Sequence, residues 1–246
     1  MGSADTGDFT AAPERVSFDG LLFDMDGTII DSTDAVIKHW HTVGEEIGVD
    51  PNVILQTSHG RRSIDILKIL APEKANWEYV RQMEALLPRL HGDSAVEIPG
   101  ARALLADLIA RRAPWAIVTS GTEPLVNGWL GVLGLPSPPP DLLITAESVA
   151  VGKPDPACYR LGRERLGLAG GDGRRVLVLE DSPAGIRAGK DAGCAVIGLV
   201  TSHTLEQVLV AGPDWVVRDL ESVSVVPGER AAVTLEIRDA FVKRTA

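Results

Sequence analysis

Short apolar runs rich in β-branched residues alternate with longer stretches of helical periodicity along most of this chain. The short runs have the length of buried strands, whereas the longer stretches repeat apolar residues three and four positions apart. Such alternation predicts an α/β fold with a doubly wound, Rossmann-like parallel sheet. The expected strands are 21–23, 116–118, 142–144, 176–179, 195–200 and 215–217, and the expected helices between them are 101–111, 123–133, 157–166, 184–192 and 205–209.

One interval lacks strand-like runs and shows only helical periodicity. We therefore expect a small α-helical cap domain at 32–97, inserted after the first core strand, with two connections that lie side by side and can act as a hinge. Pro99-Gly100 marks a turn where the second connection enters the core. The remaining expected segments are cap helices at 34–47, 63–70 and 77–90, core residues 15–31 and 98–246, a disordered leader at 1–14, and a final strand pair and closing helix within 223–246.

Composition narrows the class of protein. The 246 residues are 45% hydrophobic and 24% charged, which is typical of a chain with a packed core. A formal charge of -10 disfavours nucleic acid, whose binding depends on Lys and Arg. The chain has no apolar stretch of about 20 residues and only two cysteines, Cys158 and Cys194. We expect a cytoplasmic protein that does not bind membranes and is a monomer or weak dimer.

Polar side chains follow several of the expected strands. In an open parallel sheet the carboxyl ends of the strands share one edge, where ligands bind. Residues dozens of positions apart are therefore expected to meet in one pocket. They are Asp24 and Asp26 after the first strand, Thr119 after the second, Lys153 in a later loop, and Glu180-Asp181 after the strand at 176–179.

Three of these carboxylates, those of Asp24, Asp26 and Asp181, repel one another unless a cation is present. Their oxygen donors, without His or Cys nearby, favour Mg²⁺. A metal, a lysine and a threonine hydroxyl can together hold a phosphoryl group. Asp24 and Asp26 are two positions apart and share one side of an extended segment, so one can attack while the other transfers a proton.

The motif strings resemble the haloacid dehalogenase-like superfamily. The superfamily's four motifs are matched by DMDGT at 24–28, TSGT at 119–122, GKPDP at 152–156 and LEDSPAGI at 179–186. Within it, the strings SHGRRS at 58–63, IPGA at 98–101, WAIVTSGT at 115–122 and AGKDAGC at 188–194 are similar to the fungal glycerol-phosphate and 2-deoxyglucose-6-phosphate phosphatases.

The resemblance implies a role for each matched residue. Asp24 would be the nucleophile, and Asp26 the acid that protonates the leaving oxygen and then the base that activates water. Mg²⁺ would be held by Asp24, the Asp26 backbone carbonyl and Asp181, with Glu180 near the metal or its waters. The phosphoryl group and the adjoining substrate would be bound by Thr119, Ser120, Gly121 and Lys153.

The inserted helices resemble the cap that closes over such sites. His59, Gly60, Arg61 and Arg62 are the candidates for its substrate loop, although two adjacent arginines are also typical of a solvated turn. Arg61 stands where the fungal phosphatases carry a bulky aromatic residue, which leaves substrate preference open.

The predicted function is Mg²⁺-dependent hydrolysis of a small polyol or sugar phosphate through an aspartyl-phosphate intermediate. Glycerol phosphate is the leading substrate, followed by 2-deoxyglucose 6-phosphate or another hexose phosphate. The alternatives are a sugar phosphomutase of the same fold and a non-catalytic sensor of a phosphorylated metabolite. The complete acidic set argues against a dehalogenase, which needs no metal.

Overall fold

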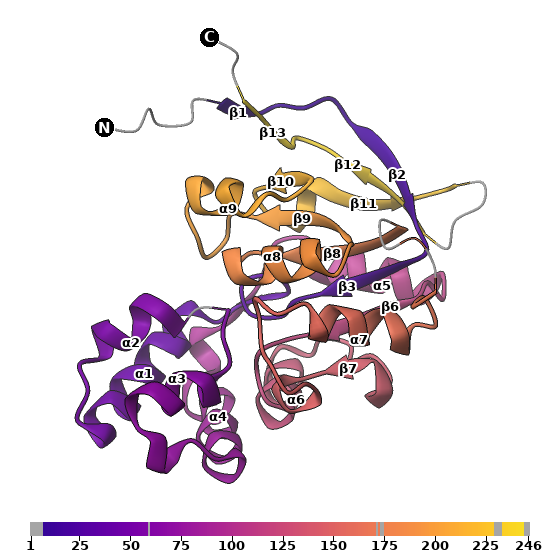
Figure 1. Ribbon diagram of the computed structural model, residues 1–246. Coiled ribbons are helices and arrows are strands. Elements are labelled where there is room, and N and C mark those ends of the chain that lie inside the picture. The colour runs from indigo at the N-terminus through magenta and orange to yellow at the C-terminus, as the bar shows by residue number, and fades with distance from the viewer. Residues whose placement is uncertain (1–6, 59, 171, 173–174, 229–232, 244–246) are drawn as a thin grey trace.

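The computed structural model describes residues 7–58, 60–170, 172, 175–228 and 233–243. Its centre is a six-stranded parallel sheet in the order β10-β9-β8-β3-β6-β7 (Figure 1). The first strand of this sheet in the chain, β3, lies in the middle, and later strands fill first one side and then the other, so the doubly wound prediction is confirmed. The strands are β3 (Gly20–Phe23), β6 (Trp115–Val118), β7 (Leu143–Ile144), β8 (Val176–Glu180), β9 (Ala195–Leu199) and β10 (Trp215–Val217).

Side chains alternate between the two faces of the sheet, and each face has its own buried core. On β3, Leu21 and Phe23 enter one core, whereas Leu22 enters the other. Both faces are therefore apolar, as a parallel sheet covered on two sides requires. The first core is covered by α5 (Ala101–Ala110) and α6 (Glu123–Leu133), and the second by α7 (Ala157–Arg165), α8 (Pro183–Asp191) and α9 (Leu205–Ala211).

Four helices form a separate cluster, here called the cap, which lies at the lower left of Figure 1. The cap has its own apolar core, which includes Trp40, Ile54 and Leu67. Two short antiparallel strands, β4 (Ile30–Asp31) and β5 (Val96–Glu97), connect it to the sheet. Its helices are α1 (Thr33–Ile47), α2 (Pro51–Ser58), α3 (Ser63–Leu70) and α4 (Trp77–His91); of these, α2 has no counterpart in the sequence prediction.

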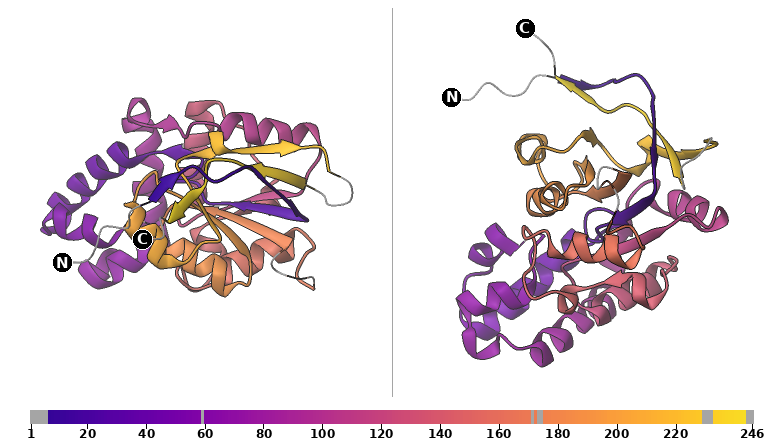
Figure 2. Two further views of the ribbon diagram at one scale, coloured as in Figure 1. Left: turned by 90° about the horizontal axis from the view of Figure 1, so that it is seen from above. Right: turned by 45° about the vertical axis from the view of Figure 1, so that its right-hand side comes forward.

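A second sheet, in the order β11-β12-β2, packs over the α5 side of the core. A further strand pair, β1 with β13, joins the two ends of the described chain, as Figure 2 shows. Phe9 and Phe241 meet edge to face across that pair, with ring centroids 5.6 Å apart. These strands are β1 (Gly7–Phe9), β2 (Glu14–Phe18), β11 (Val223–Val226), β12 (Val233–Ile237) and β13 (Phe241–Lys243).

This pairing corrects two expectations. The leader expected to be disordered over 1–14 contains β1 and the start of β2, while residues 1–6 lie outside the described residues. The strand pair expected near the C-terminus is present as β11 and β12, but β13 follows it where a closing helix was expected. β1 pairs with β13 and β2 pairs with β12, and the partners in both pairs lie more than 200 positions apart, so no local pattern reveals them.

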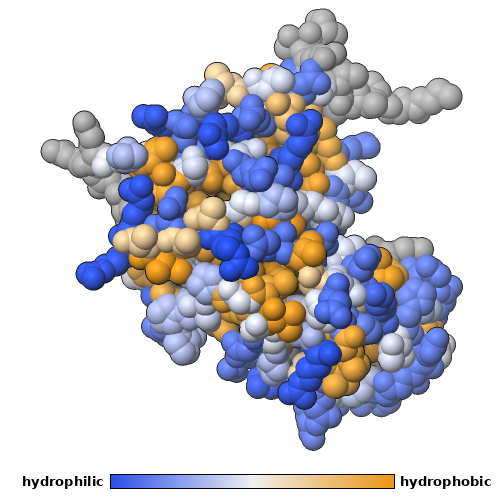
Figure 3. Space-filling model, turned by 180° about the vertical axis from the view of Figure 1, so that it is seen from behind, coloured by the Kyte–Doolittle hydropathy of each residue, from blue (hydrophilic) through white to orange (hydrophobic). Residues whose placement is uncertain are grey.

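Hydrophobic and hydrophilic residues are interspersed on the face drawn in Figure 3. Among the described residues, no helix combines the length and apolar character needed to cross a membrane.

Candidate active site

Three adjacent strands bring the predicted residues to one edge of the sheet. Asp24 follows β3, Thr119 follows β6 and Asp181 follows β8, and β3 pairs with both neighbours. The Asp24 amide extends the pairing by donating to the Leu179 carbonyl at 3.0 Å. All three side chains, together with Asp26, line a single pocket between the sheet and the cap. The expected convergence at the carboxyl edge is therefore present.

Lys153 is buried beside the carboxylates although it comes from a loop. Its Nζ lies 2.5 Å from Asp24 Oδ1 and 2.7 Å from Glu180 Oε1. It also donates to the Val118 carbonyl at 3.1 Å, so all three ammonium hydrogens have acceptors. The Tyr159 ring lies 5.1 Å from Nζ and closes the remaining side. These contacts hold Lys153 against Asp24 in one orientation.

Burial and neighbouring charges shift the acid–base properties of this cluster. Burial raises the pKa of Asp24 well above its usual value; Lys153 opposes the shift, while Glu180 and Asp181 add to it. Burial also raises the pKa of Asp26, against a hydrogen bond from Ser32. For Lys153, burial lowers the pKa, but Asp24 and Glu180 outweigh that effect and the net shift is upward. The site therefore holds more negative charge than one lysine balances.

The acidic groups are close enough to hold a cation. Carboxylate oxygens of Asp24, Glu180 and Asp181 lie within 4.8 Å of one another, and all three residues are buried. Lys153 is the cation that contacts two of them. An all-oxygen donor set with excess buried negative charge suits a hard divalent ion.

Glu180 differs from the other two because its oxygens are already occupied. Oε1 accepts from Lys153 Nζ and from the Tyr159 hydroxyl, at 2.7 and 2.9 Å. Oε2 accepts from the Asp181 amide at 3.0 Å and from the amide and hydroxyl of Ser182 at 2.9 and 3.0 Å. Gly185 of α8 leaves the space for this carboxylate, since a Cβ there would overlap it. Glu180 thus holds Lys153 and the loop after β8 in place through hydrogen bonds.

The turn after Asp26 is shaped by Gly27, whose φ of 87° favours glycine. Its amide donates to the Ile30 carbonyl at 2.6 Å, which closes the turn. A Cβ at Gly27 would overlap the Asp181 carboxylate. The turn therefore needs glycine both for its conformation and for the approach of Asp181.

Two hydroxyl groups at the site were not predicted. Ser32 donates to Asp26 Oδ1 at 2.5 Å, and Ser202 donates to Asp181 Oδ2. Both serines line the pocket. Ser202 lies in the loop after β9, so the signal that identified Asp24, a polar residue shortly after an apolar strand, also applied to it. Ser32 carried no such signal, because its contact depends on the turn at Gly27.

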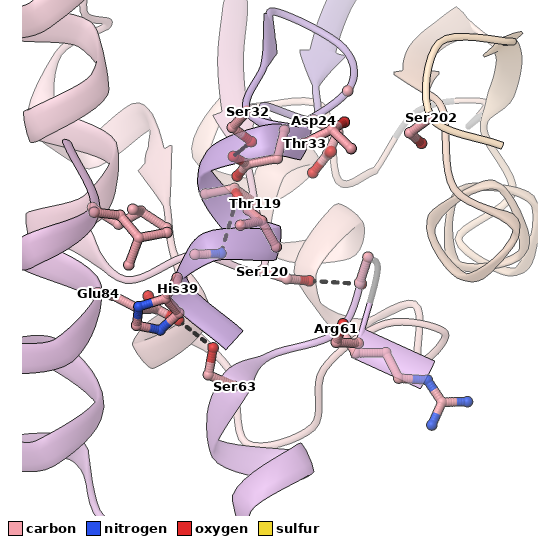
Figure 4. Close-up of a pocket in the computed structure, with 18 of the residues that line it drawn as sticks. Asp24, Ser32, Thr33, His39, Arg61, Ser63, Glu84, Thr119, Ser120 and Ser202 are labelled. Atoms are coloured by element: carbon pink, nitrogen blue, oxygen red, sulfur yellow. Dashed lines mark hydrogen bonds between the residues drawn. The ribbon is translucent and has the colours of Figure 1, made fainter. Parts of the chain in front are cut away.

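The cap forms the opposite wall of the pocket (Figure 4). The Ser120 hydroxyl donates to the Gly60 carbonyl at 3.0 Å and so joins the core to the cap. Gly121, beside it, donates its amide N–H to Thr119 Oγ1 at 3.0 Å.

Arg61 lines the pocket and is exposed, and its guanidinium is directed away from Asp24 in Figure 4. His59 lies outside the described residues. The cap residues that line the pocket are Thr33, Val36, His39, Trp40, Ser58, Gly60, Arg61, Ser63, Glu84 and Leu87.

Arg62 is a correction to the expected substrate loop. Its side chain is 3% exposed and is not part of the pocket lining. The guanidinium instead donates to the carbonyls of Ala146, Val149 and Ala150 in the core, at 3.1, 2.7 and 3.0 Å. It also pairs with Asp65 at 2.7 Å, within the cap. Arg62 is therefore a tie between cap and core, not a substrate ligand.

Comparison with known proteins gives consistent results. A family model described as haloacid dehalogenase-like hydrolase matches residues 18–193. Glycerol-1-phosphate phosphohydrolase 2 of Saccharomyces cerevisiae is 39% identical over 94% of this chain and 94% of its own length. The 2-deoxyglucose-6-phosphate phosphatase 1 of the same yeast is 34% identical, over 92% of this chain and 98% of its own.

Among solved structures, a HAD hydrolase from Entamoeba histolytica HM-1:IMSS superposes with a TM-score of 0.70. The match covers 84% of this chain and 95% of that one at 22% identity, and it bears on the fold alone. The family match covers well over half of the chain, and the motif residues Asp24, Asp26, Thr119 and Asp181 meet in one pocket. This chain belongs to the haloacid dehalogenase-like hydrolase family.

Proposed function

We propose that the protein is a Mg²⁺-dependent phosphatase that hydrolyses a small polyol or sugar phosphate through a phosphorylated Asp24. One observation carries the proposal: the Asp24 carboxylate lines the pocket while Lys153 Nζ holds its Oδ1 at 2.5 Å. A fixed carboxylate beside a buried cation is placed to attack an anionic phosphoryl group, because the cation offsets the repulsion between the two anions.

The first half-reaction transfers the phosphoryl group to the protein. The Asp24 carboxylate attacks phosphorus, and the bond from phosphorus to the ester oxygen breaks. Asp26 gives its proton to the departing oxygen, which leaves as an alcohol. Burial raises the pKa of Asp26, against a hydrogen bond from Ser32, and this favours an Asp26 that arrives protonated.

In the second half-reaction, Asp26 accepts a proton from water as that water attacks the phosphorus atom. The bond to Asp24 breaks, so inorganic phosphate leaves and the Asp24 carboxylate is restored. The Thr119 hydroxyl oxygen accepts from the Gly121 amide, and its O–H would donate to a phosphoryl oxygen. Ser120 and Gly121 line the pocket beside it, and Lys153 adds positive charge.

Asp24, Asp181 and the Asp26 backbone carbonyl would hold Mg²⁺, while Glu180 supports the set through Lys153. The ion would supply positive charge against the phosphoryl oxygens. The carboxylates meet the requirement, because oxygen atoms of Asp24 and Asp181 lie within 4.8 Å of each other and both residues are buried.

The leading substrate is glycerol phosphate, followed by 2-deoxyglucose 6-phosphate or another hexose phosphate. The names and identities of the two yeast relatives support this order.

The test is phosphate release from glycerol 1-phosphate, 2-deoxyglucose 6-phosphate, a hexitol phosphate and a nucleotide, each with Mg²⁺ and with a chelator. We expect one polyol or sugar phosphate to exceed the rest at least about tenfold in kcat/KM, which is about 1.4 kcal/mol in transition-state binding. Asp24→Asn is the matched control and should be inactive. Equal rates on all esters, or turnover that survives chelation, would refute the proposal. Net phosphate transfer within a sugar, stimulated by a sugar bisphosphate, would indicate a mutase instead.

A further inference from the structure

Two buried polar atoms on the cap side of the pocket lack partners. His39 Nε2 and Ser58 Oγ have no hydrogen-bond partner among the described residues. Their residues are only 8% and 6% exposed, and both line the pocket. A buried polar atom left unpaired is costly, and most such atoms are hydrogen-bonded. Two of them in the wall of one cavity indicate a ligand that carries complementary polar groups.

Glu84 of α4 contributes a carboxylate to the same wall. Its Oε1 accepts from the Ser63 hydroxyl at 2.5 Å, and its Oε2 accepts from the Thr122 amide of the core at 2.7 Å. These bonds fix the carboxylate from the cap and from the core. Each oxygen retains a further lone pair, because a carboxylate accepts about four hydrogen bonds. Glu84 is thus oriented and still able to accept.

His39 and Glu84 lie at the end of the pocket farther from the nucleophile, and Ser58 also lines the pocket. Figure 4 shows His39, Glu84 and Ser63 together, with Thr119 and Ser120 between them and Asp24. An ester whose phosphorus atom lies at Asp24 would therefore extend its leaving group toward His39 and Glu84.

We propose that His39, Glu84 and Ser58 form a subsite that recognises the hydroxyl groups of a neutral polyol leaving group. The inference rests on the proposed function and deepens it by assigning the chemistry of the leaving group. A hydroxyl both donates and accepts, so it can pair with Nε2 in either tautomer and donate to the Glu84 carboxylate.

Burial supports the neutral form of the imidazole. It lowers the pKa of His39 to about 4, with a smaller effect from His91 in the same direction. A neutral imidazole can form a hydrogen bond with a hydroxyl group, but it has no charge with which to attract a second phosphate. The neutral state and the unpaired Nε2 thus point to the same class of ligand.

The experiment compares glycerol 1-phosphate with propyl phosphate, which has the same carbon chain without hydroxyls. We expect the wild type with Mg²⁺ to prefer glycerol 1-phosphate at least about tenfold in kcat/KM. His39→Phe should reduce that preference about tenfold, chiefly through a lower kcat/KM on glycerol 1-phosphate. His39→Gln, whose amide can approach the position of Nε2, should keep most of the preference. His41→Phe is the control, because His41 lies on the exposed side of the same helix.

The outcomes separate this inference from the proposed function. An unchanged preference in folded His39→Phe would overturn the subsite while phosphatase activity remained. An equal loss on both esters would show that His39 serves packing alone, and that would also overturn it. Failure of the wild type to release phosphate from any ester with Mg²⁺ would refute the proposed function, and this inference with it.

Discussion

The adjacent residues Arg61 and Arg62 allow a direct test of how the cap is held to the core. Arg62→Ala removes three hydrogen bonds from a buried guanidinium to core carbonyls and a pair with Asp65. Gly152 packs against the same guanidinium, since a Cβ there would approach Arg62 Nε to 2.6 Å. Arg61→Ala is the matched control, because Arg61 is exposed and lies at the mouth of the pocket.

The loss of stability in Arg62→Ala depends on whether the groups that accepted hydrogen bonds from Arg62 can bind water instead. A hydrogen bond to a charged group contributes about 1.5–3 kcal/mol, and removing one partner of a buried ion pair costs about 3–5 kcal/mol. Asp65 and Ala150 are partly or fully exposed and can be rehydrated, whereas Ala146 is buried. We therefore expect Arg62→Ala to lower the free energy of unfolding by about 3 kcal/mol, a fall in Tm of roughly 6–12 °C for a chain of this size.

Thermal and urea unfolding would measure stability, and phosphate release would measure kcat and KM. Arg62→Ala should lose stability and several-fold in kcat/KM, because one of the ties that hold the cap wall on the core is lost. Arg61→Ala should change stability by less than about 0.5 kcal/mol, as is usual for an exposed side chain. An Arg62→Ala protein as stable as Arg61→Ala, with only its KM raised, would refute the tie and restore Arg62 as a substrate ligand.

Two further predictions concern single residues of the site. Burial raises the pKa of Glu84 to about 7, against hydrogen bonds from Ser63 and Thr122. Because the folded state holds that proton more tightly than the unfolded state, stability should fall by up to about 3 kcal/mol as the pH rises from about 4.5 to 7. Glu84→Gln should flatten this fall in urea unfolding at pH 5 and pH 8, and an unchanged pH dependence would contradict the assignment. Gly27→Ala should reduce turnover at least tenfold and destabilise by about 1–3 kcal/mol, because φ is positive and the Asp181 carboxylate blocks a Cβ. The control is Gly131→Ala in α6, where nothing lies within 4 Å and stability should hold or rise in thermal unfolding.

The local pattern of apolar and polar residues was sufficient to predict the parallel sheet and the polar residues at its carboxyl edge. Each core strand is a short apolar run, and each core helix repeats apolar residues three and four positions apart. The type of each element and its order along the chain can therefore be predicted without long-range information. Parallel strands then place their carboxyl ends together. For this reason Asp24, Thr119 and Asp181 could be assigned to one pocket although more than 150 positions separate the first from the last.

Residues whose role depends on packing between distant segments could not be assigned in this way. Arg61 and Arg62 are identical and adjacent in the sequence, yet one is exposed and the other is buried against core carbonyls. The docking of the cap on the loop at 146–150 determines that difference. In the sequence, His39 likewise looks like any other helix residue, and only the packing of the cap on the core shows that it lines the pocket. The sequence by itself determined the sheet, the inserted helices and the acidic edge, because these follow from local periodicity and strand direction. Only the tertiary structure decided which cap residues face the pocket and which hold the cap in place, because that depends on how the cap packs against the sheet domain.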